Sequence, residues 1–349
     1  MKKIRVCHIG TGDEHPGGIT TVIHNLMGNQ ELINIEQLHI VSVSRRNRLK
    51  VFLKCILKLY IEHKKNPISI AHLHMSEKGS CYRKAIIVYI CKALKIKVLV
   101  HSHGGKFEEF VKSSSGFLYS IFRKAMSISD AVVVLTPGWK NVWESLVEHE
   151  KIYVLPNSVS IPELDERSYF QNNLFNILYL GHISEMKGAF DLILAIKEFS
   201  LLDIPFNLKI AGNGEINKAY ELLERYNLTS RVELLGWVDE KLKHELLKEA
   251  DLLILPSHFE SFGIVLLEAM SFKVPVICGD GGYSKEIIHN GHDGLIIKSG
   301  NINDIVNKMT KLYSENLSEY GNNGRDTVEK FYTHKKIGLE LKKIYEEII

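Results

Sequence analysis

Two patterns of hydrophobic residues alternate along nearly the whole chain. Short runs rich in Val, Ile and Leu, with little polar alternation, predict β-strands buried on both faces of a sheet. Longer stretches in which apolar residues recur every three or four positions predict helices between the strands. The predicted strands are residues 5–9, 37–43, 69–73, 97–101, 131–135, 151–155, 176–180, 206–211, 231–235, 252–255, 275–278 and 294–298, and the helices predicted in the first half are 18–29, 49–64, 80–94, 115–127 and 138–148. This alternation predicts an α/β protein built from right-handed parallel units.

The alternation is interrupted once, in residues 156–173, which contain two prolines, a cluster of acids and a pair of asparagines. We therefore expect a Rossmann-like domain in residues 1–165 and a second in 166–332, in keeping with about 150 residues per domain. Residues 333–349 predict a lone amphipathic helix that packs on a domain already built. Two such domains are expected to face each other across a cleft at the carboxyl ends of their strands, where ligands bind.

Composition excludes several classes of protein. With 45% hydrophobic and 24% charged residues, the chain is neither disordered nor collagen-like nor rich in disulfides. Its longest apolar runs fall far short of the ~18 residues that a membrane span needs. Five scattered cysteines without a Cys-x-x-Cys pair indicate a reduced compartment, so we expect a cytoplasmic protein.

The net charge of +3 conceals an asymmetry between the two halves. Residues 1–170 hold 24 basic against 15 acidic residues, whereas the rest holds 20 against 26. Residues 45–65 alone hold eight basic residues and one acid, and Lys50, Lys54 and Lys58 recur every four positions. A basic amphipathic helix of this kind can lie on an anionic membrane surface, and the alternative is a packed surface helix with solvated lysines. No nucleic-acid reader motif accompanies the charge.

The clearest candidate site follows the predicted strand 252–255. Glu260 and Glu268 lie eight residues apart, one in a loop and one inside the helix that begins near Gly263. A helix N-terminus between two carboxylates suits a ligand with hydroxyls at both ends and a diphosphate between them. A nucleotide-sugar fits that description, with Glu260 at the sugar, Phe262, Gly263 and Ile264 around the donor, and Glu268 at the ribose. The alternative is a loop acid and an ordinary surface glutamate.

Three further loops after strands carry residues that could bind the same ligand. Lys187 could meet the charge that grows on a departing diphosphate, or be an exposed cation early in a helix. His103 follows the strand 97–101 and is expected to project into the cleft, although a plain loop residue would look the same. Gly17 and Gly18, where the first loop becomes a helix, would allow a ligand to approach the backbone closely. His101 and His103 could also suggest a metal, but no third ligand with matching spacing is visible, and His101 is expected to be structural.

An ordered set of motifs resembles the retaining glycosyltransferases of family four, which have the GT-B fold. The motifs are Glu260–Met270, Gly181-His182…Lys187-Gly188, Gly281-Gly282-Tyr283-Ser284-Lys285-Glu286 with Asp293-Gly294, Pro156-Asn157-Ser158-Val159 and Gly17-Gly18. The resemblance spans nearly the whole chain. One position departs from the family pattern: the family normally has an arginine where this chain has His182. A neutral histidine has one N–H donor, whereas the guanidinium of arginine presents several N–H donors in one plane.

The resemblance implies transfer of a sugar from a nucleotide-diphosphate donor, expected to be a UDP-sugar, to an acceptor hydroxyl with retention of configuration. The second domain would bind the donor and the basic first domain the acceptor, a saccharide or lipid-linked acceptor in bacterial surface polysaccharide synthesis. His103 would contact the primary hydroxyl of the donor sugar, Lys187 and His182 the diphosphate, and residues 333–349 would cross back to the first domain. No Asp-x-Asp occurs, so neither a metal nor another cofactor is expected.

Two alternatives keep the fold and change the activity. One is a GT-B module that binds a nucleotide-sugar or a glycan without catalysis, which the histidine at position 182 motivates. The other is an epimerase of similar fold that interconverts nucleotide-sugars without an acceptor.

Overall fold

The computed structural model describes residues 3–12, 14, 17–44, 47–105, 107–164 and 166–349. The chain forms two compact units, an N-terminal unit of Met1–Ser158 with His334–Ile349, and a C-terminal unit of Val159–Thr333. Along the chain the division falls at Ser158, seven residues before the expected boundary after residue 165. Asp165 itself lies outside the described residues.

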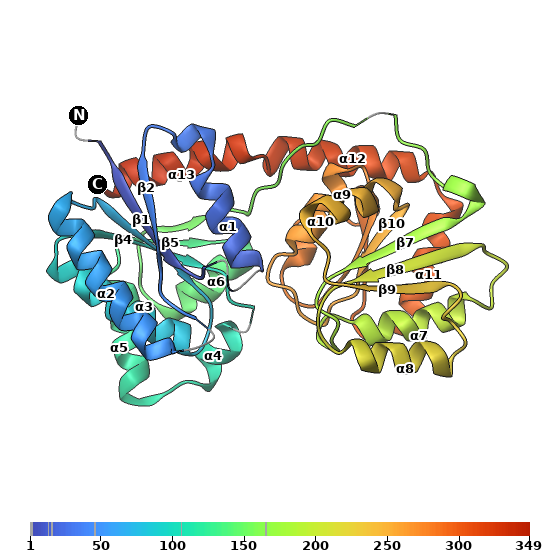
Figure 1. Cartoon of the computed structure of the whole chain (residues 1–349), viewed down its shortest axis with the longest axis horizontal. Helices are drawn as coiled ribbons and strands as arrows, with labels where there is room; N and C mark the ends of the chain where they lie inside the picture. Colours follow the sequence, from blue (N-terminus) through green and yellow to red (C-terminus); the bar gives the residue numbers. More distant parts are fainter. Residues whose placement is uncertain (1–2, 13, 15–16, 45–46, 106, 165) are drawn as a thin grey trace. The chain divides into compact units, whose positions relative to one another are not determined.

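The N-terminal unit contains a six-stranded sheet in the order β2-β1-β3-β4-β5-β6, and every neighbouring pair is parallel. Its strands are β1 (Arg5–Gly10), β2 (Glu36–Val41), β3 (Ile70–Met75), β4 (Lys97–Ser102), β5 (Ala131–Val134) and β6 (Ile152–Val154). Its helices are α1 (Gly18–Met27), α2 (Arg48–Lys65), α3 (Gly79–Ala93), α4 (Phe107–Ser113), α5 (Gly116–Ser127) and α6 (Pro137–Leu146), with α13 (His334–Ile348) from the end of the chain. In Figure 1, α13 lies beside α1, and the two helices are in contact.

The C-terminal unit repeats this plan with the order β12-β11-β10-β7-β8-β9, again entirely parallel. Its strands are β7 (Phe175–Leu180), β8 (Phe206–Ala211), β9 (Val232–Gly236), β10 (Leu252–Leu255), β11 (Val276–Gly279) and β12 (Gly294–Ile297). Its helices are α7 (Ala189–Phe199), α8 (Ile216–Arg225), α9 (Glu240–Glu249), α10 (Ile264–Ser271), α11 (Ile302–Ser314) and α12 (Leu317–Phe331). The helices α7, α8 and α9 are labelled around this sheet in Figure 1.

All twelve predicted strands are present, each within two residues of its expected ends. They are confirmed because strands covered on both faces must be apolar along their whole length, a pattern that survives any tertiary context. The short helix α4 was not predicted, since seven residues with two buried aromatics, Phe107 and Phe110, are too few to show a helical period. The expected cleft between the domains concerns their relative placement and stays a prediction.

Candidate active site

The loop after β10 turns sharply into α10 at a glycine. Gly263 precedes the helix with φ of 84°, and a Cβ there would lie 2.9 Å from Leu266 Cδ1. A larger residue would therefore be strained both by its backbone and by its neighbour. Phe262 is buried and Ile264, the first helical residue, is half-buried. The first N–H groups of α10 have no partner within the helix, so this end carries the partial positive charge expected for a diphosphate site.

Lys187 and Glu260, assigned separate roles in the sequence, form one ion pair in the structure. Lys187 Nζ lies 2.5 Å from Glu260 Oε2, and the two side chains are 27% and 13% exposed. Partial burial keeps this pair from being fully screened by solvent while leaving the ammonium accessible to a ligand. The carboxylate of Glu260 thus fixes the position of the Lys187 ammonium.

Close backbone contacts between loops create this pairing. The N–H of His258 donates to the Met186 carbonyl at 2.9 Å, which joins the loop after β10 to the loop after β7. Gly188 has φ of 68°, and a Cβ there would lie 2.1 Å from the Pro256 carbonyl oxygen. Only glycine fits this position, which explains why Lys187 is followed by glycine.

A third loop holds Glu260 from the other side. Glu260 N–H donates to the Gly281 carbonyl at 3.1 Å, and Tyr283 N–H donates to the Glu260 carbonyl at 2.8 Å. A Cβ on Gly282, where φ is 83°, would lie 2.3 Å from the Glu260 carbonyl oxygen. The glycine pair of the Gly-Gly motif therefore allows the close approach that positions Glu260.

Glu268 has a partner that sequence reasoning missed. Lys243 of α9 donates to Glu268 Oε1 at 2.7 Å, and both side chains are largely buried. Burial raises the pKa of the Glu268 carboxyl, and the Lys243 ammonium opposes that shift. No signal in the sequence singles out Lys243, because it sits in a helix crowded with charges. A ribose hydroxyl at Glu268 would meet this ion pair rather than an isolated carboxylate.

His182 is exposed in the loop after β7, and its ring approaches Gly214, where a Cβ would lie 3.0 Å from His182 Cε1. The Tyr179 hydroxyl donates to the His182 carbonyl at 2.9 Å and so anchors the loop that carries Lys187. The backbone is therefore anchored at position 182, where the resemblance leads us to expect an arginine.

In the N-terminal unit, Gly17 and Gly18 lie at the start of α1 and leave open space. Among the described residues, no heavy atom lies within 4 Å of a Cβ placed on either glycine, and Gly17 has φ of 154°. The backbone at this helix start is therefore accessible, as close approach of a ligand requires.

His103 lies at the end of a row of hydrogen-bonded histidines. His103 Nε2 and His74 Nδ1 are 3.0 Å apart, as are His74 Nε2 and His8 Nδ1, and His8 Nε2 lies 2.9 Å from Gln37 Oε1. Parallel pairing creates the row, because it sets β1 beside β3 and β3 beside β4 with these side chains on one face. Burial lowers the pKa of His8 to about 4 and that of His103 to about 3, so the row is neutral at pH 7.

Neutrality and one amide determine which nitrogens carry hydrogen. Gln37 Nε2 donates to the Met27 carbonyl at 3.4 Å, so its oxygen faces His8 and accepts from Nε2–H. A neutral ring has one N–H, so His8 Nδ1 accepts from His74 Nε2–H, and His74 Nδ1 accepts from His103 Nε2–H. We therefore assign His103 a lone pair on Nδ1, the form that accepts a hydrogen bond from a hydroxyl group.

A second row supports this face of the sheet. The Tyr345 hydroxyl of α13 lies 2.6 Å from His72 Nδ1, and His72 Nε2 lies 3.1 Å from His101 Nδ1. His101 is buried, in keeping with the structural role expected for it.

The sheet also supplies the third histidine that sequence spacing did not show. Within the described part of the chain, the ligand nitrogens of His8, His72 and His74, and those of His74, His101 and His103, come within 4.8 Å of one another. Both nitrogens of His8 and of His74 already have partners in the row. A metal would have to break those hydrogen bonds, and metal independence stays a prediction.

Comparisons with known proteins find a family match over the segment that carries most of these residues. The family described as glycosyl transferases group 1 matches residues 160–327, the segment that holds Lys187, Glu260 and Glu268. The capsular polysaccharide biosynthesis glycosyltransferase CapM of Staphylococcus aureus is 26% identical over 336 residues, which cover 89% of this chain and 85% of that protein. The UDP-Gal:alpha-D-GlcNAc-diphosphoundecaprenol alpha-1,3-galactosyltransferase of Escherichia coli is 26% identical over 320 residues, 85% of this chain and 80% of that one. The chain is a glycosyltransferase, and its residues 160–327 match the glycosyl transferases group 1.

A solved structure is similar to this glycosyltransferase in its fold. Sucrose-phosphate synthase from Thermosynechococcus elongatus matches it with a TM-score of 0.82 at 16% identity, over 99% of each chain. The expected GT-B fold is confirmed, and the family match and the named relatives support the expected glycosyltransferase enzyme.

The basic helix of this glycosyltransferase, α2, exposes an apolar stripe. Phe52, Cys55 and Leu59 face the core, but Leu49, Leu53 and Leu57 are 72%, 57% and 58% exposed. Lys50, Lys54 and Lys58 are exposed beside them, and none has an ion-pair partner among the described residues. Phe52 and Leu53 are neighbours in the sequence, but the first lies in the core and the second in solvent. Arg45 and Arg46, which precede the helix, lie outside the described residues.

Across the described ranges, none of the helices combines the length and the apolar character that crossing a bilayer requires.

Proposed function

We propose that this glycosyltransferase moves a hexosyl or N-acetylhexosaminyl group from a UDP-sugar to a hydroxyl of a saccharide or lipid-linked acceptor, with retention of configuration. The setting would be synthesis of a bacterial surface polysaccharide. The observation that carries the proposal is the Lys187–Glu260 ion pair beside the N-terminus of α10. The names of the relatives agree, since one acts in capsule synthesis and another uses UDP-Gal with a diphosphoundecaprenol-linked acceptor.

The proposed reaction assigns each group a task. A diphosphate at the start of α10 would be met by backbone N–H groups and by Lys187, so charge that develops on the leaving group is stabilised. Glu260 would accept hydrogen bonds from sugar hydroxyls, and Glu268, paired with Lys243, would hold the ribose. His103, with its Nδ1 lone pair, would accept a hydrogen bond from the primary hydroxyl of the donor sugar. No enzymic nucleophile is assigned.

The test compares wild type with Lys187→Gln and Glu260→Gln, each against a panel of UDP-sugars. Thermal shift reports donor binding, since a ligand that binds the folded state raises the melting temperature. Release of UDP reports turnover, and we expect each variant to lose about 100-fold or more of it. Lys197→Gln is the matched control, because Lys197 also pairs with a glutamate in this unit, at an exposed site on α7. Turnover that survives in Lys187→Gln would refute the assignment, and chelator should leave wild-type turnover intact.

We also propose that the exposed face of α2 holds the enzyme on an anionic membrane, on the cytoplasmic side of the cell membrane. The support is the combination of three exposed leucines with three exposed lysines on one helix. Apolar side chains can enter the headgroup region while lysines meet anionic lipids.

A further inference from the structure

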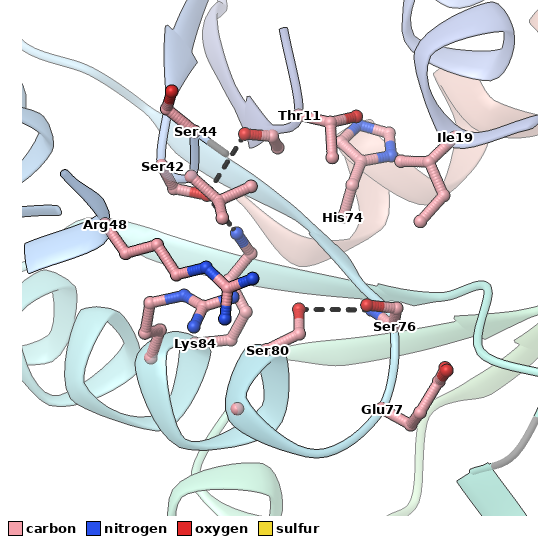
Figure 2. Close-up of a pocket in the computed structure, with 14 residues that line it drawn as sticks. Thr11, Ile19, Ser42, Ser44, Arg48, His74, Ser76, Glu77, Ser80 and Lys84 are labelled. Atoms are coloured by element: carbon pink, nitrogen blue, oxygen red, sulfur yellow. Dashed lines mark hydrogen bonds between the residues drawn. The ribbon is translucent and has the colours of Figure 1, made fainter. Parts of the chain in front are cut away.

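A cavity of about 300 Å³ in the N-terminal unit has no role in the mechanism above. It lies at the carboxyl ends of three neighbouring strands, where Gly10 ends β1, Ser42 follows β2 and Ser76 follows β3. Figure 2 shows side chains from these loops and from the starts of α2 and α3 around it. In a parallel α/β sheet, this edge is where ligands bind.

One wall of the cavity contains a buried lysine that has no counter-ion among the described residues. Lys84 is 2% exposed, and its Nζ donates to Ser42 Oγ at 2.6 Å. Ser42 Oγ in turn donates to the Gly10 carbonyl at 3.1 Å. No carboxylate of the described residues forms an ion pair with Lys84, although an ammonium has three hydrogens to donate. Burial lowers the pKa of Lys84 to about 8, so the group stays mainly charged near neutral pH.

Two arginines add to this charge. Arg83 Nε is buried and has no acceptor within the described chain. Burial and the nearby Arg48 both lower the pKa of Arg83, as expected for two guanidinium groups close together. Among the described residues that line the cavity, Glu77 is the single acid, and Figure 2 shows it across the pocket from Arg48. Like charges gathered around a cavity are costly unless an anion joins them.

We infer that this cavity binds a phosphoryl group of the acceptor, as a phosphate or diphosphate ester. The inference rests on the proposed transfer reaction and names the acceptor's chemistry. Arg48, Arg83 and Lys84 supply charge and donors for several anionic oxygens at once, which suits a phosphate better than a single carboxylate. Two of the residues that line the cavity connect it with the proposed reaction and with the proposed membrane-binding helix. His74, which bonds His103, lines it, and Arg48 is the first residue of α2.

The experiment measures binding of inorganic pyrophosphate to the full-length protein by calorimetry, with UDP at saturation so that the donor site is filled. We expect the double variant Arg48→Gln/Arg83→Gln to bind pyrophosphate at least about tenfold more weakly than wild type. Lys124→Gln/Lys343→Gln is the control, since it removes the same charge from exposed positions of the same unit and should bind as wild type does. Far-UV circular dichroism checks that each variant is folded, and Arg48→Gln alone, at an exposed residue, repeats the test with little risk to folding.

A second arm identifies the source of the phosphoryl group. Neutral phosphatidylcholine vesicles with and without a polyprenyl diphosphate are offered to the same proteins. Stronger binding to the doped vesicles that is lost in Arg48→Gln/Arg83→Gln supports a lipid-linked acceptor, whereas pyrophosphate binding without any preference for doped vesicles supports a soluble one. If wild type binds neither probe, or if the double variant binds both as tightly as wild type does, the inference is wrong. Failure of UDP to bind would instead count against the proposed function.

Discussion

At the scale of single residues, hydrogen bonds rather than charges define the chemistry of His103. Its neighbours are neutral rings, and the direction of the row is set by one amide, that of Gln37. Because each neutral imidazole has one N–H, the orientation of that amide fixes which nitrogen carries the hydrogen in each of the three rings. Gln37, on the edge strand β2, thus determines which nitrogen of His103 can accept a hydrogen bond.

This assignment predicts the tautomers of His8, His74 and His103 at pH 7. Long-range ¹H–¹⁵N spectra of the imidazoles should show the hydrogen on Nε2 in all three rings. In Gln37→Leu the row loses its terminal acceptor, and we expect the free energy of unfolding to fall by about 1–3 kcal/mol because a buried donor is left unsatisfied. The exposed His182 is the internal control, and its two tautomers should interconvert. An Nδ1–H form at any ring of the row would contradict the assignment.

At the scale of elements, α2 and α13 show how similar helices serve different purposes. Each is amphipathic in sequence, but α13 buries six residues on the N-terminal unit, while α2 leaves a leucine stripe in solvent. The period alone cannot distinguish them, because it shows that a helix has an apolar face and not what covers that face.

For α2 we predict loss of membrane binding when its charge is reversed. Lys50→Glu/Lys54→Glu/Lys58→Glu should bind anionic vesicles about 100-fold more weakly in a sedimentation assay, since each lysine near the surface contributes about 1 kcal/mol. The control Lys241→Glu/Lys248→Glu/Lys343→Glu makes the same change at exposed lysines elsewhere. Unchanged binding of the α2 variant would mean that its lysines are merely solvated.

For α13 we predict that one hydroxyl stabilises its packing. Tyr345→Phe leaves Nδ1 of the buried His72 without its partner and should lower the free energy of unfolding by about 1–3 kcal/mol in denaturant titrations. Tyr153→Phe is the matched control, because its hydroxyl meets Glu347 of the same helix at an exposed site where water can replace it. Equal losses in the two variants would argue against a special role for the buried pair.

At the scale of the whole molecule, the buried histidines make stability depend on pH in one unit. Their folded-state pKa values lie below the unfolded value near 6.5, so between those values the unfolded state binds more protons. With the histidines neutral, the free energy of unfolding therefore has its full value above about pH 6.5, and it decreases as the pH falls toward 4. Each histidine can lower the free energy of unfolding by at most about 1.4 kcal/mol per pH unit.

This predicts acid unfolding of the N-terminal unit in mild conditions. Trp139 and Trp143 are buried there, while Trp237 of the other unit is 59% exposed, so the variant Trp237→Phe isolates the signal. Denaturant titrations followed by the fluorescence of this variant should give a free energy of unfolding that is several kcal/mol lower at pH 5 than at pH 7. A midpoint that stays constant over this range would show that the row is not protonated on unfolding.

The sequence by itself determined the twelve strands, the parallel α/β plan and the loops that hold Lys187, Glu260 and His103. Those features depend on local periodicity and on motifs within one loop, both of which are written in consecutive residues. The tertiary structure alone decided that Lys187 and Glu260 form an ion pair, that Glu268 meets Lys243, and that five histidines from three strands share one face. It also decided that Arg48, Arg83 and Lys84 surround one cavity. Such contacts arise from strand order and register, which place residues 25 to 73 positions apart within hydrogen-bond distance, and no local pattern encodes them.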